Sequence, residues 1–385
     1  MVDWRSKIVN ILSQVDDLSD AARARVEKIK GRNDPLKILP YLGYGSTTRV
    51  CLNGRVLEDE GIGQANAADT IWENLVNMYK RFESDEVAGA RVCARFLGDE
   101  VETITDNDGY FSFSFQPTSL PYEHLWHDVE LELLDPQPLD GKLVKAIGKV
   151  LLPSSQARFG VISDIDDTVI QTNVGNKLKM ILGIALLNAR TRLPFKGVAG
   201  FYNALQQGSS GKENNPIFYI SSSPWNLYDP LIEFLEIHGI PIGPLFLKDF
   251  GEQTILDASN HFAHKTDKIE RLLALYPHLP FILIGDNGEQ DPEIYTTIVS
   301  KYPDRVRVIY IRSVNTAAAR IDAINRLVAE VSKTGCQLVL AQDSESVAIH
   351  AAGEGLISLA GLDSVRAQSY VDEYSPNARE VVDEE

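Results

Sequence analysis

Residues 159–168 have the sequence FGVISDIDDT, in which a short continuous apolar run leads directly into three acidic residues. Further apolar runs follow along the chain, and segments with helical periodicity such as DPLIEFLEIHG separate them. Such runs are typical of parallel strands that are buried on both faces. The pattern predicts an α/β domain over residues 154–355 with a doubly wound, mostly parallel sheet. The other runs are IFYIS (217–221), LFLK (245–248), FILIG (281–285), VRVIYIR (306–312) and QLVLA (337–341).

An alternating pattern precedes this domain. In TDNDGYFSFSF, residues 105–115, the Asp108-Gly109 pair predicts a turn, and the three phenylalanines after it fall on one face of a strand. Apolar residues at 129, 131 and 133 repeat the alternation. We therefore expect a β-sandwich-like domain over residues 45–153, interrupted by a helix around residues 72–82.

The two ends of the chain give weaker patterns. Three-and-four spacing of apolar residues predicts a helical N-terminal segment over residues 1–44, and polar composition predicts a frayed acidic tail over residues 356–385. The first residues lack the apolar core of a signal peptide, and the longest apolar stretch, Met180–Leu187, is too short to span a membrane. Three cysteines without C-x-x-C spacing fit reduced thiols. We expect a cytoplasmic protein.

The charge of the chain limits its partners. A formal net charge of −17 repels nucleic acid and anionic membranes at long range, so we expect no nucleic-acid partner. Residues 174–202 differ, because they join an apolar helix to five basic residues. Such a segment can dock on a lipid headgroup layer as a peripheral membrane contact, or it can be a core-packing helix with solvated charged ends. The basic residues are Lys177, Lys179, Arg190, Arg192 and Lys196.

Polar residues end three of the predicted strands, at the edge where open α/β sheets bind ligands. Carboxylates concentrated at one edge repel each other strongly unless a cation neutralises them. Hard oxygen ligands without histidine or cysteine favour Mg²⁺. The sequence therefore indicates a magnesium site at this edge. The residues concerned are Asp164, Asp166, Asp167 and Thr168 after the first run, Ser221, Ser222 and Ser223 after the second, and Asp286, Glu289 and Asp291 after the fourth.

Four motifs occur in an order that strongly resembles the haloacid dehalogenase superfamily. They are D-x-D-x-T after a buried strand, a serine that closes the next run, a lysine that enters a helix, and G-D-x-x-x-x-D after a later strand. FGVISDIDDTVIQT, FYISSSPWNLY and FILIGDNGEQDPEIY are similar to the catalytic domain of App1-type phosphatidate phosphatases, and the resemblance extends over nearly the whole chain. It implies a fold of the haloacid dehalogenase type and Mg²⁺-dependent hydrolysis of a phosphate monoester, with phosphatidate or a related lipid phosphate as the expected substrate.

The resemblance also implies roles for individual residues. Asp164 would be the nucleophile that forms an aspartyl-phosphate, and Asp166 the general acid and then the general base. Ser221 would hydrogen-bond the phosphoryl oxygens and Lys265 would neutralise their charge, with Ser222 and Lys268 as alternatives. Magnesium ligands, and residues that support them, complete the implied site. The ligands would be Asp164, the backbone carbonyl of Asp166 and Asp286, with Thr168 supporting the loop and Asp291 acting behind the ligands or through metal-bound water.

Other functions remain open at this point. A phosphatase for a soluble phosphate ester would use the same acidic cluster. A signalling receiver domain also combines acidic residues with a serine or threonine and a lysine, but it does not need the motif from Gly285 to Asp291. A lipid-binding module that has lost turnover is a further alternative, against which the presence of both Asp164 and Asp166 argues. The sequence leaves open the role of the β-rich domain and the oligomeric state.

Overall fold

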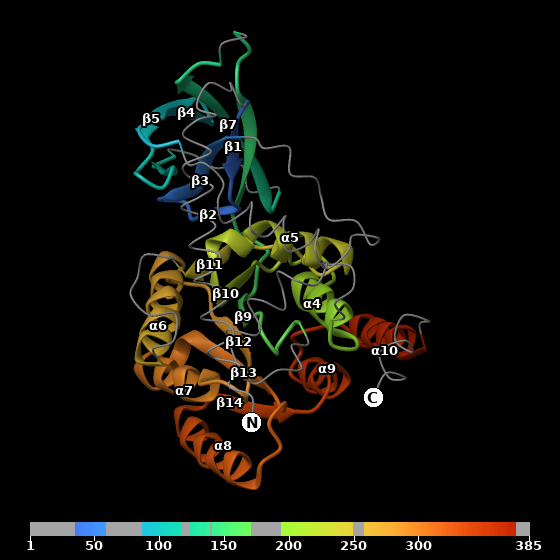
Figure 1. Cartoon of the computed structure of the whole chain (residues 1–385). Helices are drawn as coiled ribbons and strands as arrows, with labels where there is room; N and C mark the ends of the chain where they lie inside the picture. The colour runs from blue at the N-terminus through green and yellow to red at the C-terminus, as the bar shows by residue number, and fades with distance from the viewer. Residues whose placement is uncertain are drawn as a thin grey trace.

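The computed structural model describes residues 35–58, 87–117, 124–138, 141–170, 194–248 and 258–374. These residues form a β-rich part and an α/β part, which lie one above the other in Figure 1. The helices expected within residues 1–44 and around 72–82 lie outside the described residues, as does most of the basic segment 174–202. None of the described helices is long and apolar enough to cross a membrane.

All six apolar runs of the α/β part form strands of one parallel sheet, as predicted. The strand order is β11-β10-β9-β12-β13-β14, so the direction of winding reverses between β9 and β12. In open α/β sheets, ligands bind outside the carboxyl ends of the strands at such a reversal. The strands are β9 (Gly160–Asp164), β10 (Ile217–Pro224), β11 (Leu245–Lys248), β12 (Phe281–Asp286), β13 (Val306–Arg312) and β14 (Gln337–Ala341).

Helices cover both faces of this sheet, as Figure 1 shows. Successive strand residues point to opposite faces, so Val161 on β9 packs in one hydrophobic cluster and Ile162 in the other. One face carries α4 (Val198–Gln207), α5 (Tyr228–Ile237), α9 (Ser344–Gly353) and α10 (Leu359–Tyr374). The other face carries α6 (Ala258–Leu275), α7 (Asp291–Lys301) and α8 (Ala318–Val331). The α/β part also contains three short 3-10 helices, η1 (Trp225–Leu227), η2 (Pro303–Arg305) and η3 (Ser332–Thr334).

The β-rich part is one eight-stranded sheet folded around its own hydrophobic core. Phe111, Phe113 and Phe115 are all buried in that core, as the alternation predicted. The sheet is mixed, because β2 and β8 pair in parallel. The strands are β1 (Leu36–Pro40), β2 (Gly43–Gly45), β3 (Val50–Glu58), β4 (Arg91–Phe96), β5 (Asp99–Ile104), β6 (Tyr110–Phe115), β7 (Trp126–Asp135) and β8 (Lys145–Leu151).

The β-rich part begins earlier than residue 45. Strand β1 lies within the segment expected to be helical, and it pairs antiparallel with β3 from Leu36 opposite Glu58 to Pro40 opposite Gly54. Its proline is tolerated because β1 is an edge strand, where one row of backbone donors has no neighbouring strand to bond.

The expected tail is wrong for residues 359–374, which form helix α10 and pack on α4. Small residues allow the two helices to approach closely. A Cβ atom on Gly200 would lie 3.1 Å from the Cα of Val365, and one on Gly361 would lie 3.1 Å from the Cβ of Ala204. Because glycines take the place of large apolar residues at this contact, few apolar residues recur at helical spacing. The sequence pattern was therefore too weak to predict helix α10.

The β-rich part packs against the segment that directly follows β10. The ring of Tyr41 stacks on that of Trp225 at a centroid distance of 4.6 Å, and the amide of Leu42 donates a 2.6 Å hydrogen bond to the hydroxyl of Tyr228. On the other face of the sheet, Tyr44 meets Phe246 edge to face at 5.0 Å. These contacts fix the β-rich part next to the carboxyl ends of β10 and β11.

Candidate active site

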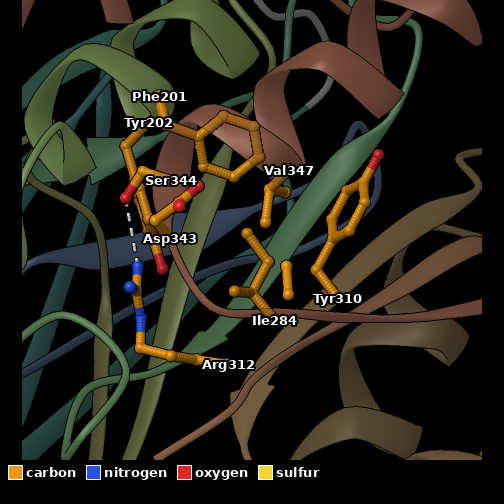
Figure 2. A pocket seen from close by; sticks show the side chains of 9 residues that line it. Phe201, Tyr202, Ile284, Tyr310, Arg312, Asp343, Ser344 and Val347 are labelled. Carbon is orange, nitrogen blue, oxygen red and sulfur yellow. Dashed lines mark hydrogen bonds between the residues drawn. The ribbon is translucent and has the colours of Figure 1, made fainter. Parts of the chain in front are cut away.

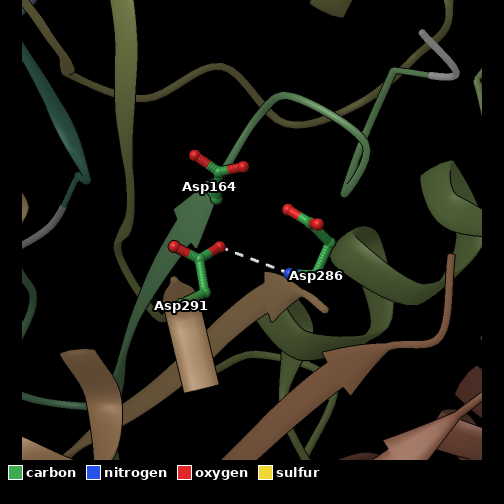
Figure 3. Close-up of side chains that lie close together, drawn as sticks. All are labelled: Asp164, Asp286 and Asp291. Atoms are coloured by element: carbon green, nitrogen blue, oxygen red, sulfur yellow. Dashed lines mark hydrogen bonds between the residues drawn. The ribbon is translucent and has the colours of Figure 1, made fainter. Parts of the chain in front are cut away.

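Three carboxylates converge where β9 and β12 end side by side. Asp164 closes β9, Asp286 closes β12, and Asp291 is the first residue of α7. One carboxylate oxygen of each lies within 4.8 Å of the others, and all three side chains are at most 1% exposed. Figure 3 shows the three carboxylates facing a common space. The structure thus brings Asp164 together with Asp286, which lies 122 residues further along the chain, and with Asp291.

A tight loop after β9 returns the second aspartate to this space. The amides of Val169 and Ile170 both donate to the carbonyl of Ile165, at 2.9 and 3.1 Å. Asp167 adopts φ 53°, a left-handed conformation that aspartate tolerates better than most residues. Asp166 is consequently only 4% exposed, whereas Asp167 is partly exposed.

Ser221 and Asp166 meet across the pocket. The Ser221 hydroxyl donates a 2.9 Å hydrogen bond to Asp166 Oδ2 and accepts one of 3.0 Å from the amide of Ser223. A bulge places the serine there, since Ile220 of β10 pairs with Phe246 of β11 but the next registered pair is Pro224 with Lys248. Bulges of this kind re-aim side chains near functional sites. Ser222, the alternative from the sequence, has a buried hydroxyl with no hydrogen-bond partner among the described residues.

Lys265 connects two of the carboxylates. Its Nζ lies 2.7 Å from Asp164 Oδ1 and 2.6 Å from Asp291 Oδ1, and the side chain is 1% exposed. Burial opposes its charge, but Asp164, Asp291 and Glu289 outweigh burial and raise the pKa of Lys265 well above its ordinary value. Lys268, three residues further along α6, is half-buried. Lys265 is therefore the lysine that reaches the carboxylates, and it stays protonated.

Asp291 is held on both of its oxygens. Oδ1 is paired with Lys265, and Oδ2 accepts a 3.3 Å hydrogen bond from the amide of Asp286, the dashed line in Figure 3. Gly285 makes this approach feasible, because a Cβ atom at that position would lie 2.3 Å from Asp291 Oδ2. A carboxylate engaged in this way is suited to orienting its neighbours.

The remaining carboxylate oxygens have the character of ligands for a hard cation. Asp164 Oδ2 and Asp286 Oδ2 are buried, and neither has a hydrogen-bond partner among the described residues. Desolvation is the largest cause that raises the pKa of Asp164 and of Asp286 well above the ordinary range, and nearby carboxylates raise both further. Buried, unbonded and mutually repelling oxygen atoms fit Mg²⁺, which prefers carboxylate and carbonyl oxygen.

The pKa of Asp166 is raised to about 7, first by burial and then by the charge of Glu289, while the hydrogen bond from Ser221 lowers it. A carboxyl group with this pKa exchanges a proton readily near neutral pH. Asp164 and Asp166, two residues apart, thus have different surroundings, since Asp164 is paired with Lys265 and Asp166 is bonded to a hydroxyl.

Two residues that support the loop after β12 were not predicted. Asn287 is fully buried, and its Oδ1 accepts hydrogen bonds from the amides of Val314 and Asn315 at 2.8 and 2.7 Å. Arg320 donates to the backbone carbonyls of Asn287 and Glu289 and also pairs with Glu293. Arg320 lies in α8, and an isolated arginine in a helical pattern carries no signal that it contacts a distant loop.

Arg312 supports the other acidic loop in a similar manner. It closes β13 and lines a cavity between the sheet and helices α4 and α9, which Figure 2 shows. Its Nε donates to the carbonyl of Thr168 at 3.2 Å, its Nη2 donates to Ser344 Oγ at 3.1 Å, and its guanidinium lies 4.0 Å from the ring centre of Phe195. Thr168 therefore supports the acidic loop through its backbone, with Arg312 as the partner.

Residues 159–313 match the family described as phosphatidate phosphatase APP1, catalytic domain. This segment is similar to the catalytic domains of that family. The chain is 33% identical over 158 residues to phosphatidate phosphatase APP1 of Saccharomyces cerevisiae, which is 40% of this chain and 26% of that protein. It is 28% identical over 246 residues to an uncharacterized protein of Schizosaccharomyces pombe, which is 62% of this chain and 38% of that protein. The chain thus spans well under half the length of either relative.

All of the residues discussed above as acidic, hydroxyl or lysine members of the site lie within the segment that matches this family. Arg320, in α8, lies beyond its matched boundary. Among solved structures, a carbohydrate acetylesterase from Xanthomonas citri shares 12% identity over 76% of this chain and 72% of that chain, with a TM-score of 0.26. A similarity that low carries no argument about the fold or the site.

Proposed function

We propose that this protein is a phosphatase that hydrolyses a phosphate monoester, with phosphatidate or a related lipid phosphate as its substrate. The observation that carries the proposal is the convergence of Asp164, Asp166, Ser221, Lys265 and Asp286 at one site beside the reversal of strand order. Similarity to an enzyme described as a phosphatidate phosphatase supports the lipid substrate. The order and chemistry of the motifs support a fold of the haloacid dehalogenase type.

In the proposed mechanism, Asp164 attacks the phosphorus atom and the ester oxygen leaves, which yields an aspartyl-phosphate. Asp166 donates a proton to the leaving oxygen, a step that its raised pKa favours near neutral pH. The same carboxylate then accepts a proton from the water that hydrolyses the aspartyl-phosphate. Ser221, hydrogen-bonded to Asp166, is positioned to bond a phosphoryl oxygen in both steps.

Lys265 has two functions in this proposal. It holds Asp164 in place through the 2.7 Å contact, and its positive charge offsets negative charge that develops on the phosphoryl group. Asp291 fixes the lysine from the other side, at 2.6 Å. The chain's own residues therefore supply the nucleophile, the proton donor and one cation.

Asp164, Asp286 and the backbone carbonyl of Asp166 are the proposed ligands of Mg²⁺, with Asp291 behind them. When bound, the ion would neutralise the carboxylates and polarise the phosphoryl group. The buried, unbonded oxygens of Asp164 and Asp286 support this assignment.

Peripheral contact with a membrane is part of the lipid proposal. Of the five basic residues expected to form a headgroup-binding edge, Lys196 alone lies among the described residues, and its Nζ is 3.8 Å from Glu373. A cytoplasmic location remains a prediction from the sequence. The competing proposal, a phosphatase for a soluble ester, uses the same catalytic residues and differs only in the substrate.

Phosphate release from phosphatidate vesicles and from a panel of soluble phosphate esters tests both proposals. We expect Mg²⁺-dependent release from the vesicles, which EDTA suppresses reversibly and which Asp164→Asn abolishes. Turnover of soluble esters alone would exclude the lipid substrate. Turnover that continues without a divalent metal would refute the metal assignment, and equal activity in Asp164→Asn would refute the nucleophile.

A further inference from the structure

Lys248 is a buried lysine that the catalytic roles above do not use. It closes β11, the strand next to β10, and its residue is only 5% exposed. Among the residues that the structure describes, none forms a hydrogen bond or an ion pair with it. A largely buried lysine without a partner among these residues is available to bind an anionic ligand.

Two serine hydroxyls without a hydrogen-bond partner in the described part of the chain directly precede the residue that is registered with Lys248. In the parallel sheet Lys248 is registered with Pro224, directly after the serines of β10. The hydroxyls of Ser222 and Ser223 are buried and have no hydrogen-bond partner among the described residues, and Ser223 is fully buried. Hydroxyls and an ammonium group can all donate hydrogen bonds to an anion.

Unbonded acceptors gather on the opposite side. Asp164 Oδ2 and Asp286 Oδ2, at the ends of β9 and β12, have no hydrogen-bond partner among the described residues and can bind a cation. The hydrogen-bond donors lie at the ends of β10 and β11. Strand alternation places Lys248 on the same face of the sheet as Phe246, which is the face that α6 and Lys265 cover. Strand β11 lies two strand spacings, about 10 Å, from β9, and a lysine side chain together with a phosphate group can span that distance.

We propose that Lys248 is a substrate-binding residue that contacts an anionic oxygen of the phosphate ester, with the hydroxyls of Ser222 and Ser223 beside it. This inference rests on the proposed phosphatase function and adds a specificity-determining cation to it. Lys265 is already neutralised by two aspartates, so it offers the substrate less attraction before reaction than an unpaired lysine does. Lys248 therefore contributes mainly to substrate binding, and Lys265 mainly to the chemical step.

The kinetic test compares wild type, Lys248→Met and Lys248→Arg in the full chain with Mg²⁺, on phosphatidate in mixed micelles and on p-nitrophenyl phosphate. Loss of one charge-assisted hydrogen bond is expected to raise KM about tenfold or more in Lys248→Met on both substrates, with kcat within about threefold of wild type. Lys248→Arg should restore KM, and Lys333→Met, at an exposed lysine of η3, should match wild type. An unchanged KM, a loss confined to kcat, or a rise on phosphatidate alone would overturn the inference.

Thermal unfolding without phosphate separates binding from a structural role. Lys248→Met removes a lysine that has no ionic partner among the described residues, so its melting temperature should equal or exceed that of wild type. A lower melting temperature would indicate that the lysine stabilises the fold and would overturn the assignment.

Inorganic phosphate provides a test that does not depend on turnover. If wild type hydrolyses neither substrate, the proposed function fails, but calorimetric titration of phosphate into the Mg²⁺-loaded proteins still examines Lys248. Weaker binding to Lys248→Met than to wild type supports the inference. Equal affinity of the two proteins overturns it.

Discussion

Replacement of Lys265 by methionine tests the electrostatic design of the pocket most directly. The change keeps much of the side-chain volume but removes the only positive charge within 2.7 Å of Asp164 and 2.6 Å of Asp291 that the described residues provide. Both carboxylates are at most 1% exposed, so water cannot replace the lost partner. We expect the free energy of unfolding to fall in metal-free buffer.

The size of the loss follows from the burial of all three groups. Removing one partner of a buried ion pair typically costs about 3–5 kcal/mol, because an uncompensated charge stays behind. Asp291→Asn should be less costly, because Lys265 keeps Asp164 as a partner. In the double variant Lys265→Met with Asp291→Asn, one of the two stranded charges is gone, so a coupling of about 1–3 kcal/mol is expected.

Urea unfolding of the four proteins in EDTA, followed by tryptophan fluorescence, measures these quantities. Repeating the series in millimolar Mg²⁺ should restore part of the stability of Lys265→Met, since the freed carboxylates bind the ion and binding stabilises the native state by mass action. A loss below about 1 kcal/mol for Lys265→Met, or additive effects within about 0.5 kcal/mol, would show that the lysine does not balance these carboxylates as inferred.

Three further outcomes follow from the geometry. The pKa of Asp166 is raised to about 7, and its protonated form donates the proton, so kcat/KM for an alkyl phosphate should fall above about pH 7. The value for p-nitrophenyl phosphate should change less, because its leaving group needs no proton. Equal pH profiles for the two substrates would contradict the role of Asp166 as the proton donor. Gly285→Ala should lower kcat at least about tenfold, since the new Cβ would displace Asp291, and a wild-type kcat would contradict the packing. Arg320→Met, which removes donors to two carbonyls of the loop after β12, should weaken Mg²⁺ binding by about tenfold in calorimetry, and unchanged affinity would exclude a positioning role.

The sequence predicted that several of these residues lie close together because they stand at the ends of strands. Each strand is a continuous apolar run, and the residue after it must lie at the carboxyl edge of a parallel sheet. From the sequence alone, that rule predicts that Asp164, Ser221 and Asp286 lie near one another. It left Lys265 and Lys268 open, because three residues on a helix differ by a rotation of about 60° that the pattern near a helix start does not define.

Residues that act through tertiary contacts were not predictable in this way. Arg312 and Arg320 reach backbone carbonyls of loops that are far from them in sequence, and nothing in their local pattern shows such a partner. Lys248 was missed for a different reason, although a signal existed. A lysine that closes the run LFLK in a fully buried strand has to be buried at the same edge as the acidic residues.

The distribution of unpaired groups argues that this pocket binds two ligands of opposite charge. If the charges served only stability, Lys248 would have an ionic partner among the described residues, and Asp286 Oδ2 would accept a hydrogen bond as Asp286 Oδ1 does from the amides of Gly288 and Glu289. Instead Lys248 and Asp286 end strands on opposite sides of β9 and β10, and Lys265 pairs with Asp164 and Asp291 between them. A cation at the carboxylates and an anion at the lysine and serines would satisfy both sides at once. Binding of either should therefore strengthen binding of the other, because each ligand's charge attracts its neighbour across the pocket.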